Sequence, residues 1–435
     1  MTYTLGIDIG TTSICALARN TETGKPELVL NRPNRASLPA PVPYARLQNP
    51  DILLGTVRNL LAEATGSLGR PAAIGFSGQM HGILCLDRDG NALSPLYTWQ
   101  DARAVQDAGD GECFTDRITR LTGYRVPAGY GLATFYANLV RGEVPAGTAK
   151  LCTIHDWTAM RLAGLTSPLT HPSDAASLGL YDLRRAEFDR QALTALGISP
   201  DILPEIAPER KPIGHTPDGI PVFPALGDNQ ASFLGAAGEA RGRLLVNIGT
   251  GSQVSAVGPL GDPLPGIEYR PFLDGSFLLV GSSLCGGRAY ALLEKLFRDI
   301  ANLCGADIRS AYPFMDRLTG QDASPAGLTV DTRFDGTRSE PALRGSITGI
   351  SVDNLTPRAL ADGFMNGIAE ELYGLYRAMG DVSVHTLIGS GNGLRANPAL
   401  CRAVECRFGM PLTLTDTREE AALGAAIYAA GGLEQ

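Results

Sequence analysis

The sequence predicts an α/β protein built from two related halves around a central cleft. Three observations support this: one strand–turn–strand pattern occurs twice, apolar residues at helical spacing lie between the strands, and glycine is frequent. The chain has 435 residues, of which 52 are Gly, whereas Gly makes up roughly 7% of an average protein. A chain of this length is too long for one ordinary core and suits two domains. Frequent Gly fits a fold with many tight strand-to-helix turns.

The repeat is clearest in two predicted hairpins. Residues 7–13 (IDIGTTS) align with residues 246–252 (VNIGTGS). In each segment a β-branched apolar run enters a Gly/Thr turn and a second strand follows, which is typical of a β-hairpin with a small polar tip. A second pair, residues 74–79 (IGFSGQ) and 387–392 (LIGSGN), follows in the same order. Two matches in one order predict a duplicated protein.

The predicted domains are residues 1–238, with the first hairpin, and residues 239–435, with the second hairpin. Apolar residues at helical spacing predict core-facing helices within 53–61 and 360–379. A capping box at 417–420 (TREE) predicts the start of the last helix.

The composition excludes several classes of partner. Lys and Arg number 37 against 45 Asp and Glu, a net charge of −8, so we expect no nucleic-acid partner, because phosphate backbones are bound by basic surfaces. The start (MTYTLGIDIGTT) lacks the features of a signal peptide, and no run approaches the roughly 18 apolar residues of a membrane span. The eight cysteines include no CxxC pair, which favours reduced, buried thiols. We therefore expect a cytoplasmic protein without a membrane partner.

The tips of both hairpins are suited to phosphate, although either alone could be a plain tight turn. Small residues let the backbone approach phosphate oxygens, and Thr hydroxyls add donors. Asp8 lies on the strand face opposite to Ile7 and Ile9, so we expect it to face the cleft, where a carboxylate can hold the hydration shell of Mg²⁺. Asn247 takes its place in the second half. The predicted phosphate-binding residues are Gly10, Thr11, Thr12, Gly249, Thr250 and Gly251.

Asp228 is the predicted catalytic base. An apolar strand ends at Gly227 and a small-residue helix follows, so Asp228 is placed at the helix N-cap, where the helix dipole favours its ionised form. An isolated Asp at this position is more often a structural cap. Here, however, Ala231 and Gly235 allow close backbone approach, which a cap does not require. A positioned carboxylate can accept the proton of an attacking hydroxyl during phosphoryl transfer.

Residues 77–82 (SGQMHG) combine hydrogen-bond donors with apolar surface after a strand. A sugar presents both hydroxyls and C–H faces, so Gln79, Met80 and His81 are candidate sugar contacts. A lone His in a turn is more often structural, which is the alternative for His81.

Trp99 lies between Thr98 and an amide–acid pair that ends at Asp101. This arrangement would form an aromatic platform with polar groups beside it, and packing in the core is the alternative. Further along, the Gly-rich turn 389–393 (GSGNG) follows a strand and is a place where an adenosine could lie.

These segments together resemble the FGGY family of carbohydrate kinases, along essentially the whole chain. Within the family they are most similar to members that phosphorylate sedoheptulose, while SGQMHG is shared with members that phosphorylate xylulose. The resemblance implies that both halves have the ribonuclease-H-like fold of actin and hexokinase (the actin/hexokinase-type ATPase domain). The segments that carry it are TWQD at 98–101, GYGLAT at 129–134, TIHD at 153–156, DAASLG at 174–179, ALGDNQAS at 225–232 and GSGNGLRANP at 389–398.

The resemblance also implies roles for individual residues. Asp228 would be the catalytic base, and Asp8 the acid near Mg²⁺, acting through water. Implied sugar contacts are Met80, His81, Tyr130 and Asn229. The residue patterns described above add Gln79, Trp99 and Asp101 to the predicted sugar site. Implied nucleotide contacts, besides the hairpin tips, are Gly286, Gly389, Ser390, Gly391 and Asn392.

The predicted function is ATP-dependent phosphorylation of sedoheptulose to sedoheptulose 7-phosphate, with ATP, Mg²⁺ and a small ketose as ligands and a monomer or homodimer as the assembly. A xylulokinase or another pentulose or polyol kinase of the family is an open alternative. An actin-like assembly protein would share both hairpins and the cleft, but it would need neither the Met80/His81 turn nor Asp228. A sugar sensor without catalysis is a third possibility, which the presence of Asp8 and Asp228 disfavours.

Overall fold

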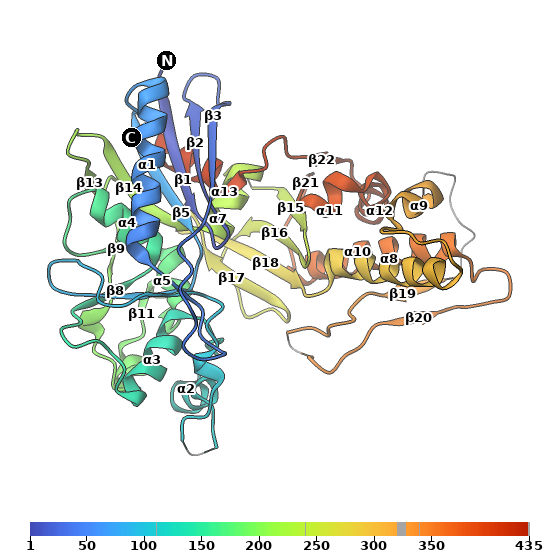
Figure 1. Ribbon diagram of the computed structural model, residues 1–435, viewed down its shortest axis with the longest axis horizontal. Helices are drawn as coiled ribbons and strands as arrows, with labels where there is room; N and C mark the ends of the chain where they lie inside the picture. The colour runs from blue at the N-terminus through green and yellow to red at the C-terminus, as the bar shows by residue number, and fades with distance from the viewer. Residues whose placement is uncertain (110, 240, 320–327, 339, 434–435) are drawn as a thin grey trace. The chain divides into compact units, whose positions relative to one another are not determined.

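The structure, a computed structural model, describes residues 1–109, 111–239, 241–319, 328–338 and 340–433 (Figure 1). Contacts divide the chain into two compact units, each with its own six-stranded sheet. The last helix of the chain belongs to unit 1, and the assignment of all residues 239–435 to one duplicated domain stays a prediction. Unit 1 is Met1–Gly238, Pro271–Gly275 and Glu419–Gln435, and unit 2 is Glu239–Arg270 and Ser276–Arg418.

The sheet of unit 1 has the strand order β13-β14-β5-β1-β2-β3. Strands β1, β2 and β3 form an antiparallel meander, and β5 and β14 extend the sheet in parallel with β1. The bounds are β1 Tyr3–Ile9, β2 Ser13–Asn20, β3 Pro26–Pro33, β5 Ala73–Gly78, β13 Gly214–His215 and β14 Pro221–Gly227.

The sheet of unit 2 has the order β17-β18-β16-β15-β21-β22. Strands β15, β16 and β18 are antiparallel, and β21 and β22 extend the sheet in parallel with β15. The bounds are β15 Arg243–Ile248, β16 Ser252–Gly258, β17 Ile267–Pro271, β18 Phe277–Ser283, β21 Thr386–Ser390 and β22 Leu412–Leu414.

Five strands of each sheet share one topology, which confirms the predicted duplication, while the sixth strand (β13 or β17) lies at opposite ends of the two sheets. In both, a hairpin is followed by a third meander strand on one side and by two parallel strands on the other. A side-chain contact is repeated as well. The Ser77 hydroxyl donates to Oδ1 of Asp8 (3.0 Å), and Nδ2 of Asn247 donates to the hydroxyl of Ser390 (2.6 Å). The pairing of residues 74–79 with residues 387–392 is therefore in register.

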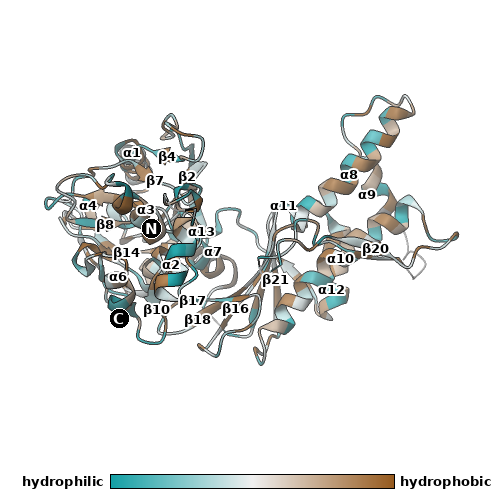
Figure 2. Ribbon diagram, turned by 90° about the horizontal axis from the view of Figure 1, so that it is seen from below, coloured by the Kyte–Doolittle hydropathy of each residue, from teal (hydrophilic) through white to brown (hydrophobic). Residues whose placement is uncertain are grey.

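Helices cover the sheets of both units, and α8 and α10 carry hydrophobic and hydrophilic residues along their length (Figure 2). Both helices predicted from apolar spacing are present as α1 and α10. The bounds in unit 1 are α1 Pro50–Leu68, α2 Phe114–Thr122, α3 Gly131–Arg141, α4 Ile154–Leu162, α5 Pro172–Leu178, α6 Arg190–Ala195, α7 Asp228–Ala237 and α13 Glu420–Gly431. Those in unit 2 are α8 Gly286–Leu303, α9 Tyr312–Thr319, α10 Pro357–Ala378, α11 Asn392–Ala396 and α12 Pro398–Phe408.

Short elements complete the described chain. Two 3₁₀ turns span Arg103–Val105 and Pro200–Ile202. The remaining strands are β4 Leu47–Gln48, β6 Leu84–Leu86, β7 Leu96–Tyr97, β8 Lys150–Cys152, β9 Leu169–Thr170, β10 Tyr181–Asp182, β11 Glu187–Phe188, β12 Glu205–Ile206, β19 Thr329–Asp331 and β20 Ser346–Thr348.

The C-terminal helix α13 packs tightly on the elements that carry the candidate site. A Cβ at Gly424 of α13 would lie 1.8 Å from the carbonyl oxygen of Ala231 in α7. A Cβ at Gly6 of β1 or at Gly75 of β5 would lie 1.8 or 2.0 Å from a carbonyl of α13. Only glycine allows this backbone approach, so α13 fixes where α7 and the two strands sit.

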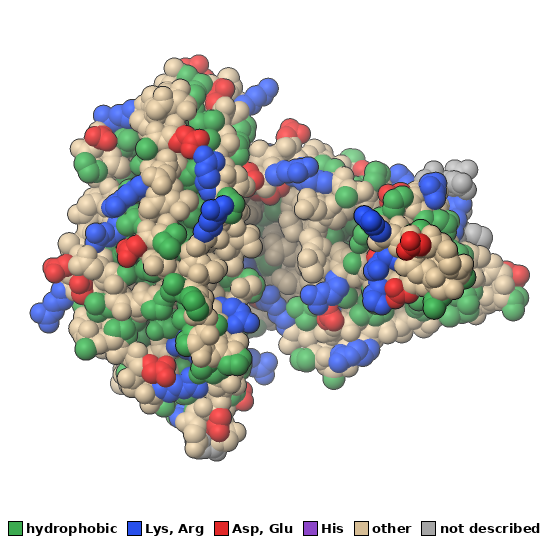
Figure 3. Space-filling view, viewed as in Figure 1, with side chains coloured by type: hydrophobic (Ala, Val, Ile, Leu, Met, Phe, Trp, Pro, Cys, Tyr) green, Lys and Arg blue, Asp and Glu red, His purple; other side chains and the backbone are tan. Residues whose placement is uncertain are grey.

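Two features of the molecule bear on its partners. Within the described ranges, no helix combines the length and the apolar character that crossing a lipid bilayer demands. On the face shown in Figure 3, Lys and Arg side chains are interspersed with Asp and Glu rather than gathered into a basic stripe.

Candidate active site

The sheet of unit 1 brings three predicted segments to one edge. Because β1, β5 and β14 are parallel, their carboxyl ends meet there. Asp8 is in register with Ser77, and Gly78 is in register with both Ile9 and Gly227. Asp228 follows Gly227 directly, so both predicted catalytic carboxylates lie at this edge.

Asp8 is partly exposed, whereas Ile7 and Ile9 beside it are fully buried. Burial raises the pKa of Asp8 to about 6, against the hydrogen bond from Ser77 and the nearby imidazole of His155, which lower it. Among the described residues, no group of three or more His, Cys, Asp and Glu side chains forms a metal site. The Asp8 carboxylate is a type of ligand that a Mg²⁺ which keeps most of its waters and binds phosphate can use.

Asp228 is the first residue of α7, and Gly227 is the N-cap. The helix therefore begins one residue earlier than the sequence suggests. The N–H of Gly227 donates to the hydroxyl of Ser173 (3.2 Å), and a Cβ at Gly227 would lie 2.6 Å from the sulfur of Met80. The sulfur of Met80 thus packs against the backbone next to Asp228.

His81 and Tyr130 form a stacked pair beside Met80. Their ring centroids are 4.0 Å apart with 17° between the planes. His81 has a positive φ of 74°, and Nδ1 lies 2.9 Å from the carbonyl oxygen of Ser177. Since a carbonyl can only accept, Nδ1 carries the proton and donates. The structure thus brings the predicted sugar contacts Met80, His81 and Tyr130 together.

Trp99 joins the same group of loops. Its side chain is 45% exposed, so core packing, the alternative interpretation, is wrong for this residue. A Cβ at Gly129 would lie 1.9 Å from the carbonyl oxygen of Trp99, and a Cβ at Gly82 would lie 2.7 Å from that of Tyr97. Close backbone packing therefore holds the loops of Trp99, Tyr130 and residues 78–82 against one another.

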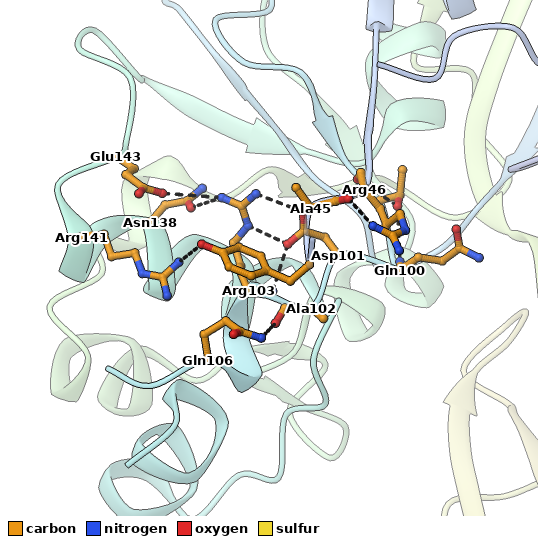
Figure 4. Close-up of polar contacts among 12 residues, drawn as sticks. Ala45, Arg46, Gln100, Asp101, Ala102, Arg103, Gln106, Asn138, Arg141 and Glu143 are labelled. Atoms are coloured by element: carbon orange, nitrogen blue, oxygen red, sulfur yellow. Dashed lines mark hydrogen bonds and ion pairs between the residues drawn. The ribbon is translucent and has the colours of Figure 1, made fainter. Parts of the chain in front are cut away.

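Asp101 is buried and bound within the protein (Figure 4). Oδ1 accepts from Nε and the backbone N–H of Arg103 (2.7 and 3.1 Å), and Oδ2 accepts from Nη2 of Arg103 and the N–H of Arg46 (3.0 and 3.1 Å). Arg103 also donates to Oδ1 of Asn138 and lies over the ring of Tyr97. These contacts stabilise the loop that carries Trp99, while a direct contact of Asp101 with sugar stays a prediction.

Gln79 and Asn229 are the remaining predicted sugar contacts. Gln79 is only 2% exposed, and its amide bonds to Thr11 and Gln48. Oδ1 of Asn229 is buried without a hydrogen-bond donor among the described residues, which a sugar hydroxyl could supply. Contact of either residue with sugar stays a prediction.

The tip of the first hairpin presents free donors. No described residue accepts a hydrogen bond from the backbone N–H of Thr11 or Thr12. Gly10 closes the turn by donating to the carbonyl of Ser13 (3.0 Å). Unpartnered N–H groups at a small-residue tip suit phosphate oxygens.

The predicted nucleotide residues of unit 2 come together at the carboxyl ends of β15 and β21. Gly287 and Arg288, in the first turn of α8, donate backbone N–H groups to the carbonyls of Gly249 and Thr250 (3.0 and 2.9 Å). A Cβ at Gly391, where φ is 88°, would lie 2.5 Å from the carbonyl oxygen of Ile248. The residues assembled in this way are Gly249, Thr250, Gly251, Gly286, Gly389, Ser390, Gly391 and Asn392.

A buried charged cluster near Asp228 was not predicted. Nε2 of His155 lies 3.0 Å from Oδ1 of Asp174, and both side chains are fully buried. Burial lowers the pKa of His155, but the carboxylates of Asp174, Asp156 and Asp228 together raise it to about 9. Burial next to Asp174 raises the pKa of Asp156. The only sequence signal was that His155 and Asp174 fall in the TIHD and DAASLG segments.

Comparisons with known proteins place the chain in a family. Residues 3–235 match the N-terminal domain of the FGGY family of carbohydrate kinases, and residues 244–433 match its C-terminal domain. The chain therefore belongs to the FGGY family and is a carbohydrate kinase.

Individual relatives span nearly the whole chain. It is 29% identical to the sedoheptulokinase of Homo sapiens, with 98% of this chain and 96% of the relative covered. It is 25% identical to the xylulose kinase of Bacillus subtilis (strain 168), with 99% and 88% covered.

Solved structures agree with the predicted fold. The xylulose kinase of Rhodospirillum rubrum superposes with a TM-score of 0.83 at 22% identity, covering 98% of this chain and 89% of that one. The glycerol kinase of Plasmodium falciparum with ADP gives a TM-score of 0.83 at 19% identity, covering 100% and 90%. The prediction of two ribonuclease-H-like domains is confirmed.

Proposed function

We propose that the protein transfers the γ-phosphoryl group of ATP to the terminal hydroxyl of a ketose, with sedoheptulose as the preferred acceptor. The single observation that carries the proposal is the strand register of unit 1. It puts Asp8 and Asp228 at one sheet edge, next to a turn that carries Met80 and His81. A carboxylate pair beside a loop of mixed polarity suits phosphorylation of a sugar, because one acid can act as base and the other can bind a metal near the phosphates.

The proposed chemistry assigns Asp228 as the base. It accepts the proton of the terminal hydroxyl while that oxygen bonds to the γ-phosphorus and the bond to ADP breaks. Asp8 fits a hydrated Mg²⁺, because no described residue donates to its Oδ2; the ion would neutralise charge on the phosphates. The free N–H groups of Thr11 and Thr12 would bind phosphate oxygens, and the Gly-rich turns of unit 2 would bind adenosine and phosphate.

Sedoheptulose is preferred on the similarity to relatives named sedoheptulokinase, which extends over 98% of this chain. Each additional hydroxyl that is recognised contributes roughly 0.5–1.5 kcal/mol. A heptulose and a pentulose therefore differ strongly only if several hydroxyls are bound. Xylulose remains the competing acceptor, since a xylulose kinase covers the chain to the same extent.

The test is ADP release with Mg–ATP over sedoheptulose, xylulose, ribulose and glycerol, comparing kcat/KM. Sedoheptulose should give the highest value, and a tenfold preference for a pentulose would remove the heptulose assignment but leave the kinase. Asp228→Asn should lower kcat by about 10²–10⁴ without changing ketose affinity. Asp51→Asn is the matched control, because Asp51 is an exposed acid in the first turn of another helix, α1. Equal activity of the two variants would refute the role of Asp228.

A further inference from the structure

The carbonyl groups at the tip of the first hairpin are all bound by two residues outside it. Asn34 donates from Nδ2 to the oxygen of Gly10 and from its backbone N–H to the oxygen of Thr12, both at 2.9 Å. Gln48 donates from Nε2 to the oxygen of Thr11 (3.2 Å). These donors neutralise three oxygens that would otherwise repel a phosphate, and the N–H groups of the tip are left for an anion. Neither residue belongs to any predicted motif.

Gln48 also belongs to a closed ring of hydrogen bonds. Its Oε1 accepts from Nε2 of Gln79 (2.9 Å), and Oε1 of Gln79 accepts from the hydroxyl of Thr11 (3.3 Å). The ring closes where Nε2 of Gln48 reaches the carbonyl of Thr11. The Thr11 hydroxyl also accepts from Nε1 of Trp99 (2.9 Å). Since an indole N–H can only donate and a carbonyl can only accept, every bond in the ring has a fixed direction.

The ring connects the two kinds of predicted ligand contact. Gln79 lies in the turn with Met80 and His81, Trp99 is the exposed aromatic side chain beside them, and Thr11 is at the phosphate tip. Gln48 and Gln79 are buried, at 3% and 2% exposed, so a lost partner would leave a buried amide unsatisfied. Hydrogen bonds in such a network strengthen one another and respond as a unit.

We propose that Gln48 is a positioning residue that couples ketose binding at the Gln79–Trp99 loops to phosphate binding at the hairpin tip. The inference rests on the proposed kinase function. A sugar that holds Gln79 and Trp99 in place stabilises the ring and so holds the Thr11 carbonyl away from the phosphate position. The tip is then prepared for ATP, and by linkage ATP tightens the binding of the sugar by the same factor.

The test measures the dissociation constant of sedoheptulose with and without a saturating, non-hydrolysable Mg–ATP analogue. Tryptophan fluorescence supplies the signal, because Trp99 is exposed and the other tryptophan, Trp157, is 1% exposed. In the wild type the nucleotide should lower this constant roughly 5- to 50-fold. Gln48→Met should reduce that factor to below about twofold. Gln106→Met, which also loses one side-chain bond to a carbonyl, should keep the full factor.

Thr11→Val tests the coupling independently, because it removes the hydroxyl from the ring and keeps the side-chain shape. It should lose the coupling to the same extent as Gln48→Met, and the double variant should lose no more than either single one. Thr11 is partly exposed, so this arm also serves if Gln48→Met does not fold.

Several outcomes would overturn the coupling: a wild-type factor near one, an unchanged factor in Gln48→Met, or losses that multiply in the double variant. A wild type that releases no ADP with any ketose would instead refute the proposed function. The two failures are therefore distinguishable.

Discussion

Replacing Arg103 by Met should destabilise unit 1 strongly, because it leaves the carboxylate of Asp101 buried. The Asp101 side chain is fully buried and that of Arg103 is 7% exposed. Two of the four hydrogen bonds to the carboxylate come from the guanidinium, and the other two come from backbone N–H groups. Removing one partner of a buried ion pair costs about 3–5 kcal/mol, so the free energy of unfolding should fall by that amount.

A double variant separates the interaction energy of the Asp101–Arg103 pair from the contacts that each residue makes with its surroundings. Asp101→Leu combined with Arg103→Met removes both charges, and replacement of a whole buried pair by apolar groups is often nearly neutral. The double variant should therefore lose less free energy of unfolding than the two single variants together, by roughly 2 kcal/mol or more. Arg32→Met is the control, because Arg32 pairs with Glu63 at the surface, where each side chain is 45% exposed, and should cost under about 1 kcal/mol.

Urea unfolding followed by tryptophan fluorescence measures these changes. Both tryptophans, Trp99 and Trp157, lie in unit 1, so the signal follows this unit alone. If Arg103→Met cost no more than Arg32→Met, or if the losses in the double variant simply added, the reasoning about the buried pair would be refuted.

Three further predictions concern backbone packing and pH. Gly424→Ala should lower the free energy of unfolding by roughly 3 kcal/mol or more, because the methyl group would overlap the carbonyl of Ala231. Gly123→Ala should cost only about 1 kcal/mol, since its φ is 77° but nothing lies within 4 Å; equal losses in urea unfolding would contradict both. The pKa of His155, raised to about 9 by Asp174 despite burial, implies stabilisation that is complete below pH 6.5 and lost towards pH 9. Thermal unfolding should show a fall on the order of 3 kcal/mol across this window, which His155→Gln should abolish; an unchanged slope would contradict it.

One local signal predicted the start of the last helix, which is present as α13, two residues too early. Residues 417–420 have the pattern of a capping box, yet α13 begins at Glu420 and its N-cap, Glu419, makes no side-chain cap bond. The side chain of Arg395 explains this, because it donates to the carbonyls of Thr415 and Thr417. A contact with a residue some twenty positions earlier keeps the segment out of the helix, and no propensity rule contains that information.

The sequence by itself determined the duplication, both hairpins and the strand that carries Asp8. Each depends only on residues close together in the chain. A strand puts successive side chains on opposite faces and a hairpin turn favours small residues, so both leave a pattern in the sequence. Only the tertiary structure decided that Arg46 and Asn138 bind the Asp101–Arg103 pair and that Gln48 and Asn34 hold the first hairpin. These contacts join segments through packing and buried hydrogen bonds, whose partners are set by which strands pair and not by spacing along the chain.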